Sequence, residues 1–84
     1  MKEKIHIGEL IKTKLKEDCR SMTWLAKQVH CDSSSFFKLL KKNHIDTELL
    51  LRISLILNYD FFVHYTSLIR EYKENAKDLR QNYP

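Results

Sequence analysis

Two short amphipathic segments, each preceded by a residue that can cap a helix, constrain the fold more than any other feature of this chain. The segments cover residues 21–29 and 32–42. Ser21 and Asp32 carry side-chain oxygens that can accept hydrogen bonds from the free backbone N–H groups at a helix start. Apolar side chains then recur at helical spacing, as Leu25, Ala26 and Val29 in the first segment and as Phe36, Leu39 and Leu40 in the second. The pattern predicts two helices joined by a tight turn.

The composition favours one small helical domain. The chain has 84 residues, of which 43% are hydrophobic, and it includes four Phe, four Tyr and one Trp. This apolar content is too high for a disordered tail. A single Gly and a single Pro leave few sites for the turns of hairpins, so we expect an all-α fold.

Three further helices are expected around the central pair. The first runs from about Ile7 to Asp18, one starts after Asp46, and one is capped by Asp60. Asn43 and Asn58 follow two of the apolar segments, where a left-handed residue commonly ends a helix. The expected fold is therefore a bundle of five helices.

A second apolar pattern continues toward the C-terminus. Its members are spaced alternately by three and four residues, and they are Phe62, Tyr65, Ile69, Tyr72, Ala76, Leu79 and Tyr83. This spacing is typical of the seam of a helix that pairs with another helix. We therefore predict a helical domain over residues 1–65 and a helical extension over 66–84 that forms a dimer interface. The alternative is that the extension folds back on its own domain or frays beyond about Tyr72.

The positive charge is concentrated on the central pair of helices. The formal net charge is +4, and residues 20–45 contain Asp32 as their one acidic residue, against the five bases Arg20, Lys27, Lys38, Lys41 and Lys42. A local basic patch attracts polyanions such as nucleic acids. Small soluble domains often carry surplus lysines, so charge alone does not decide between these interpretations.

Other chemistries find little support in the sequence. Cys19 and Cys31 form no Cys-x-x-Cys motif, and the nearby His30 and His44 do not complete a common zinc spacing. We interpret Cys31 as a buried free thiol and expect no cofactor or metal. No glycine-rich loop, paired carboxylates or nucleophile triad indicates an enzyme. With no signal peptide or membrane-spanning segment recognisable, we expect a reducing, cytoplasmic setting.

A set of ordered anchors resembles a known family. The anchors are Ile7-Gly8-Glu9-Leu10-Ile11, Leu25-Ala26, Phe36, Leu39, Leu50, Ile53 and Leu57. Their order and spacing resemble the Cro/XRE (lambda-repressor-like) helix-turn-helix family over about residues 5–65. The resemblance implies a small regulator of bacterial, phage or mobile-element origin. It also implies a five-helix bundle whose third helix, about residues 33–42, lies in the major groove.

The resemblance assigns roles to individual positions. Ser33, Ser34 and Lys38 would read base edges. Lys41, Lys42, Asn43 and His44 would meet the DNA backbone after the third helix, and Met22 and Thr23 would face a phosphate at the start of the second. Phe37, where the family usually has a polar residue, would touch a thymine methyl group or tuck against the neighbouring loop.

Four further positions depart from the family pattern. Met22 stands where the family often has glutamine, which puts a side-chain contact there in doubt. His30 replaces the usual turn glycine and must tolerate a left-handed conformation, which His does better than most residues. Leu15 and Leu40 replace a buried arginine–glutamate pair, and a whole pair exchanged for apolar residues is often neutral or stabilising.

The sequence thus predicts a double-stranded DNA-binding repressor that binds an inverted-repeat operator as a homodimer, without a membrane or a small-molecule ligand. The alternative is a protein-interaction adaptor or an antitoxin component built on the same fold, because fold does not fix function.

Overall fold

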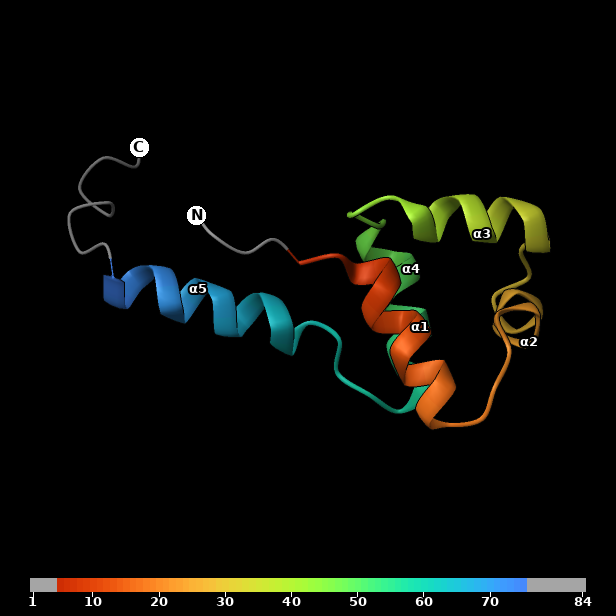
Figure 1. Cartoon of the computed structure of the whole chain (residues 1–84), viewed down its shortest axis with the longest axis horizontal. Coiled ribbons are helices and arrows are strands. Elements are labelled where there is room, and N and C mark those ends of the chain that lie inside the picture. The colour runs from red at the N-terminus through yellow and green to blue at the C-terminus, as the bar shows by residue number, and fades with distance from the viewer. Residues whose placement is uncertain (1–4, 76–84) are drawn as a thin grey trace.

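The computed structural model describes residues 5–75 of the chain, and within that range it is entirely helical (Figure 1). The helices are α1 (Ile7–Glu17), α2 (Met22–Gln28), α3 (Ser33–Lys41), α4 (Thr47–Leu57) and α5 (Val63–Asn75). The predicted all-α class and the helix count are therefore confirmed. No helix among these residues is long and apolar enough to cross a membrane.

Local capping explains where three of the helices begin. Ser21, Asp32 and Asp46 each accept a hydrogen bond from the backbone N–H three residues further on, at 3.0, 3.2 and 3.0 Å. Such bonds satisfy N–H groups that have no partner inside the helix. The predicted starts of α2, α3 and α4 are therefore confirmed.

The first four helices, together with Phe61, supply the buried core. Its members are Ile7, Ile11, Leu15, Leu25, Ala26, Val29, Phe36, Leu40, Leu50, Ile53, Leu57 and Phe61. Leu15 and Leu40 are only 2% and 1% exposed. The two positions at which the family pattern places an ion pair are thus both apolar and both buried, so no charge is left unpaired there.

The chain's single glycine lies where α1 meets α3. A Cβ atom at Gly8 would stand 1.8 Å from the carbonyl oxygen of Leu40 and 2.7 Å from its carbonyl carbon. The obstacle is backbone, which cannot turn away as a flexible side chain could. Gly8 therefore permits a close approach of the two helix backbones.

Three helices end on a left-handed residue that is not glycine. Cys19, His30 and Asn58 have φ angles of 57°, 59° and 52°. This confirms the predictions for His30 and Asn58, whereas Cys19 was not predicted. The prediction for Asn43 is wrong, because α3 ends at Lys42 in an extended conformation with φ −77° and ψ 155°.

Helix α5 leaves the bundle rather than joining its core. Asp60 accepts a hydrogen bond from the Phe62 N–H at 3.0 Å, but Phe61 and Phe62 form a turn first, and α5 begins only at Val63. The fifth helix and the extension predicted from residue 66 are consequently one unbroken helix as far as Asn75. It contains no buried residue and points away from α1–α4 (Figure 1).

Candidate nucleic-acid interface

The turn between α2 and α3 is closed by backbone hydrogen bonds. Beyond the end of α2, the N–H of Cys31 donates to the carbonyl of Ala26 at 2.8 Å, and the N–H of His30 donates to that of Lys27 at 3.1 Å. A left-handed residue between the helices is required for this closure, and His30 supplies it. Asp32 then caps α3, so the two helices follow each other with almost no intervening chain.

Two long-range hydrogen bonds hold this helical pair against the rest of the bundle. The Arg52 guanidinium on α4 donates to the carbonyl of Val29 at 3.1 Å, at the end of α2. The His6 ring Nε2 lies 3.1 Å from the carbonyl oxygen of Lys41, at the end of α3. Since His6 Nδ1 accepts from the Glu9 N–H at 3.2 Å, the ring proton is on Nε2 and donates to Lys41. His6 thereby caps α1 and anchors α3.

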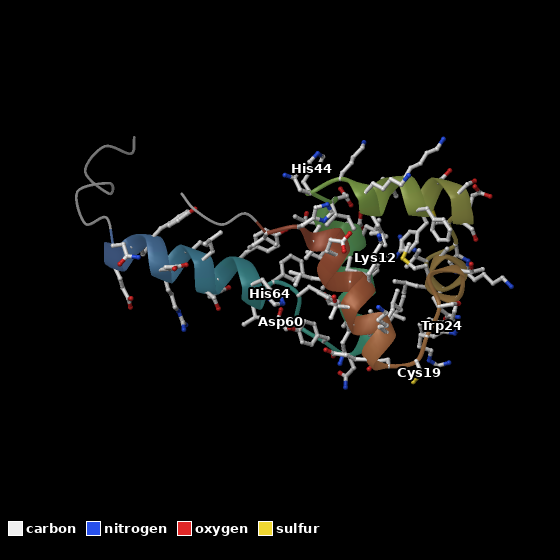
Figure 2. The ribbon with its side chains drawn as sticks, in the orientation of Figure 1. Lys12, Cys19, Trp24, His44, Asp60 and His64 are labelled. Carbon is white, nitrogen blue, oxygen red and sulfur yellow. The ribbon has the colours of Figure 1, made fainter. Side chains whose placement is uncertain are left out.

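With its inner face fixed, α3 turns a separate stripe of side chains outward. Phe36 and Leu40 are buried, whereas Ser34, Phe37, Lys38 and Lys41 are all exposed. Their spacing of three and four residues places them along one side of the helix. Nitrogen-tipped side chains extend from this edge away from the bundle in Figure 2. We call these four residues the α3 stripe.

The lysines of the α3 stripe make no ion pair with the described residues. Ion pairs in that part of the chain join Lys12 to Glu9 at 3.4 Å and Lys14 to Asp18 at 3.5 Å, both within α1. Lys38 and Lys41 therefore keep their charge available for an external anion.

The remaining predicted DNA contacts divide into exposed and covered residues. Thr23 is exposed, but Met22 is half-buried and packs against the core. At the start of α2, the groups open to a phosphate are therefore Thr23 and backbone N–H groups. Ser33 is half-buried, and Phe37 keeps 40% of its surface exposed.

The segment over residues 42–44 directly follows α3, and we call this segment together with the α3 stripe the α3 edge. Lys42, Asn43 and His44 are all exposed. His44 lies at the C-terminal end of this edge (Figure 2). These three residues therefore leave their side chains accessible directly after the end of α3.

The N-terminal end of α3 carries a second, local hydrogen-bond arrangement. The Ser34 hydroxyl lies 2.6 Å from Asp32 Oδ2, the same oxygen that accepts from the Ser35 N–H. The hydrogen bond from Ser34 and that from the Ser35 backbone lower the pKa of Asp32 below its usual value of 3.8. Asp32 is therefore ionised at neutral pH, and its charge is directed at the helix start.

Three residues of the predicted dimer stripe, Tyr65, Ile69 and Tyr72, lie on α5. Phe62 precedes the helix and Tyr65 lies in its first turn, and both are half-buried against the core. Further along, Tyr72 is half-buried and Ile69 is 54% exposed. Ala76, Leu79 and Tyr83 lie outside the described residues.

The base of α5 is held by aromatic contacts. The Tyr59 hydroxyl and His64 Nε2 lie 2.9 Å apart, and the Tyr59 ring meets that of Phe61 edge to face at a centroid distance of 4.7 Å. Lys14 stands over the Tyr59 ring at 5.2 Å. Asp60 and His64 lie close to this junction in Figure 2. The direction in which α5 leaves the bundle is therefore set by a short, packed connection.

The site also depends on residues that the sequence did not single out as positioning groups, namely His6 and Arg52. Their partners lie 35 and 23 residues away along the chain. A histidine one residue before an amphipathic segment is a weak sign of a cap, and an arginine among leucines is a weak sign of an anchored side chain. Neither signal identifies the partner. No cluster of metal-ligating side chains occurs among residues 5–75.

Comparisons of the chain with known protein families, with curated proteins and with solved structures found no match. The function proposed below therefore rests on the geometry of the α3 edge and on the resemblance of the sequence to the Cro/XRE family.

Proposed function

We propose that this chain is a sequence-specific, double-stranded DNA-binding regulator that acts as a repressor, in the manner of the Cro/XRE (lambda-repressor-like) family. The observation that carries the proposal is the α3 stripe, an exposed helix face with two lysines that form no ion pair with any of residues 5–75. The major groove of B-DNA is wide enough to admit such a helix. A bacterial or phage regulator of this kind works in the cytoplasm.

The residues of this edge divide into two roles. Lys41, Lys42 and the segment through His44 neutralise phosphates, which supplies affinity irrespective of sequence. Ser34 and Lys38, on the groove side of the helix, contact base edges and supply specificity. Phe37 provides an apolar surface suited to a thymine methyl group.

The proposed binding unit is a homodimer. The half-exposed stripe of Tyr65, Ile69 and Tyr72 on α5 is available to the same stripe of a second copy. A twofold dimer of helix-turn-helix domains binds inverted half-sites about one helical turn, roughly 34 Å, apart.

Two lysine substitutions test the division of roles. Lys38→Ala is expected to weaken operator binding by about 1–3 kcal/mol and to relax the preference at one base position. Lys41→Ala is expected to weaken all sequences alike and to lower the slope of log affinity against log salt by about one. Titrations of labelled duplexes at several salt concentrations measure both effects.

Lys12→Ala is the matched control, because it removes one positive charge from α1, where Lys12 is already paired with Glu9. Its salt slope should equal that of the unmodified chain. An equal loss for Lys12→Ala and Lys38→Ala, or unchanged base preference in Lys38→Ala, would contradict the proposal.

A second function is favoured by a different surface. Leu51 and Leu55 lie one turn apart on α4 and are 50% and 71% exposed, so they offer an apolar patch for a protein partner. This favours an adaptor or an antitoxin component. Selection from random duplexes at low salt distinguishes the two functions, since a reproducible motif supports the regulator and the absence of any enrichment supports the adaptor.

A further inference from the structure

The Ser34 hydroxyl is already committed to a partner within the chain. It lies 2.6 Å from Asp32 Oδ2, a distance typical of a hydroxyl that donates to an ionised carboxylate. An ionised carboxylate can only accept hydrogen bonds. The lowered pKa of Asp32 is consistent with a carboxylate that stays charged while it caps the helix.

Because its proton is used in this bond, the Ser34 hydroxyl can only accept hydrogen bonds from a ligand. A serine hydroxyl has one proton and two lone pairs. Since the proton points to Asp32, only lone pairs remain for a ligand that approaches the exposed side of α3. The negative charge of Asp32 behind the hydroxyl strengthens this acceptor character.

We propose that Ser34 reads DNA as an obligate hydrogen-bond acceptor and selects a base that carries an exocyclic amino group, adenine or cytosine, at one operator position. This inference rests on the proposed function of the α3 stripe as the base-reading surface. In the major groove, adenine N6 and cytosine N4 are the donors, whereas guanine O6 and N7 and thymine O4 are acceptors. Guanine or thymine at this position would bring two sets of lone pairs together.

Lys38 complements Ser34 on the same face of α3. The two side chains are four residues apart and lie one above the other on the helix. A lysine ammonium donates and cannot accept, so it favours the acceptors of guanine. The expected half-site therefore combines an amino-bearing base opposite Ser34 with a guanine opposite Lys38.

The experiment compares duplex selection by three proteins, namely the unmodified chain, Ser34→Ala and Asp32→Asn. The unmodified chain should enrich adenine or cytosine at one position, and Ser34→Ala should lose that preference alone. Asn is as good a helix cap as Asp. Its side-chain oxygen can take the place of Asp32 Oδ2 and accept from both the Ser35 N–H and the Ser34 hydroxyl, so Asp32→Asn should keep the preference for adenine or cytosine.

Base analogues test the same contact without changing the protein. Purine in place of adenine, or pyrimidin-2-one in place of cytosine, removes only the exocyclic amino group. At the Ser34 position this exchange should weaken binding of the unmodified chain about three- to tenfold, the value of one hydrogen bond. It should leave binding of Ser34→Ala unchanged.

The outcomes separate this inference from the function on which it rests. If no motif is enriched by the unmodified chain, the DNA-binding function fails and the inference fails with it. A motif that is enriched but unaffected by Ser34→Ala, or a Ser34-dependent position that selects guanine or thymine, overturns the inference alone. Circular dichroism of each variant verifies that its helices are intact.

Discussion

The α3 edge and helix α5 differ in how firmly the bundle holds them. Helix α3 buries Phe36 and Leu40, is capped by Asp32, and is anchored at its end by His6. Helix α5 is longer, yet it buries no residue and is secured mainly by the packing just before its first turn. A surface that reads base edges gains from being fixed before binding, because less freedom is then lost in the complex. In the proposed dimer, α5 would gain from the second copy the packing that the bundle does not supply.

A substitution at the contact between α1 and α3 should give the largest loss in the free energy of unfolding. Gly8→Ala places a Cβ atom against the Leu40 carbonyl oxygen, and we expect a loss of about 3 kcal/mol in the free energy of unfolding. Denaturant unfolding measures this loss. Lys16→Ala, on the exposed side of the same helix, should change stability by about 0.5 kcal/mol or less. Equal stability of the two variants would show that α1 and α3 do not approach as closely as described.

The His6 bridge should have the next largest effect. His6→Ala removes the cap of α1 and the hydrogen bond to the Lys41 carbonyl, so we expect a loss of about 1–2 kcal/mol in thermal or denaturant unfolding. His44→Ala is the control, because His44 is exposed beyond the end of α3. It should weaken DNA binding while leaving stability within about 0.5 kcal/mol. A His6→Ala variant as stable as His44→Ala would argue that α3 is not anchored from α1.

The left-handed end of α1 should respond in the opposite direction. Cys19→Gly relieves the steric cost of a side chain at φ 57°, and we expect a gain of about 0.5–1 kcal/mol. Lys16→Gly, within α1, should instead lose about 1 kcal/mol. Chemical denaturation of both variants determines the sign, and a loss for Cys19→Gly would refute the strain assigned to this residue.

The smallest effect on stability is expected on α5. Ile69→Glu should change the free energy of unfolding by about 0.5 kcal/mol or less, because Ile69 is 54% exposed and does not belong to the residues packed against the core. In the proposed dimer it should nevertheless shift the chain to a monomer in sedimentation or light scattering. Ser67→Glu, exposed on the same helix but off the stripe, should leave the oligomeric state unchanged. An identical result for both variants would remove α5 from the proposed interface.

Features set by neighbouring residues were predictable from the sequence. Ser21, Asp32 and Asp46 cap helices through bonds that span three residues, and Asn58 adopts the left-handed conformation that its position suggested. The outward face of α3 followed from its apolar period. The prediction for Asn43 was wrong because an asparagine after a helix permits a left-handed residue without requiring one. Helix α3 instead ends at Lys42, which is extended.

Features that depend on distant partners were not predictable. The Arg52 bond to Val29 and the close approach of Gly8 to Leu40 exist only once the helices are packed. The Ser34–Asp32 bond is local, but a serine two residues after a capping aspartate has several alternative partners, and only the folded geometry selects one. Thus the exposed face of α3 could be inferred from the sequence, whereas the hydrogen-bond polarity of its side chains could not.

The packed junction between Asn58 and Val63 has a consequence for the proposed operator. An α-helix turns by about 100° per residue, so one residue inserted in this junction would rotate the α5 stripe by up to about that angle relative to the α3 edge. In the proposed twofold dimer, that rotation would change the orientation of both copies of α3 at once. The length of this junction would then determine the distance between the two half-sites. A change in that length would alter the distance without changing any residue of the proposed DNA contact.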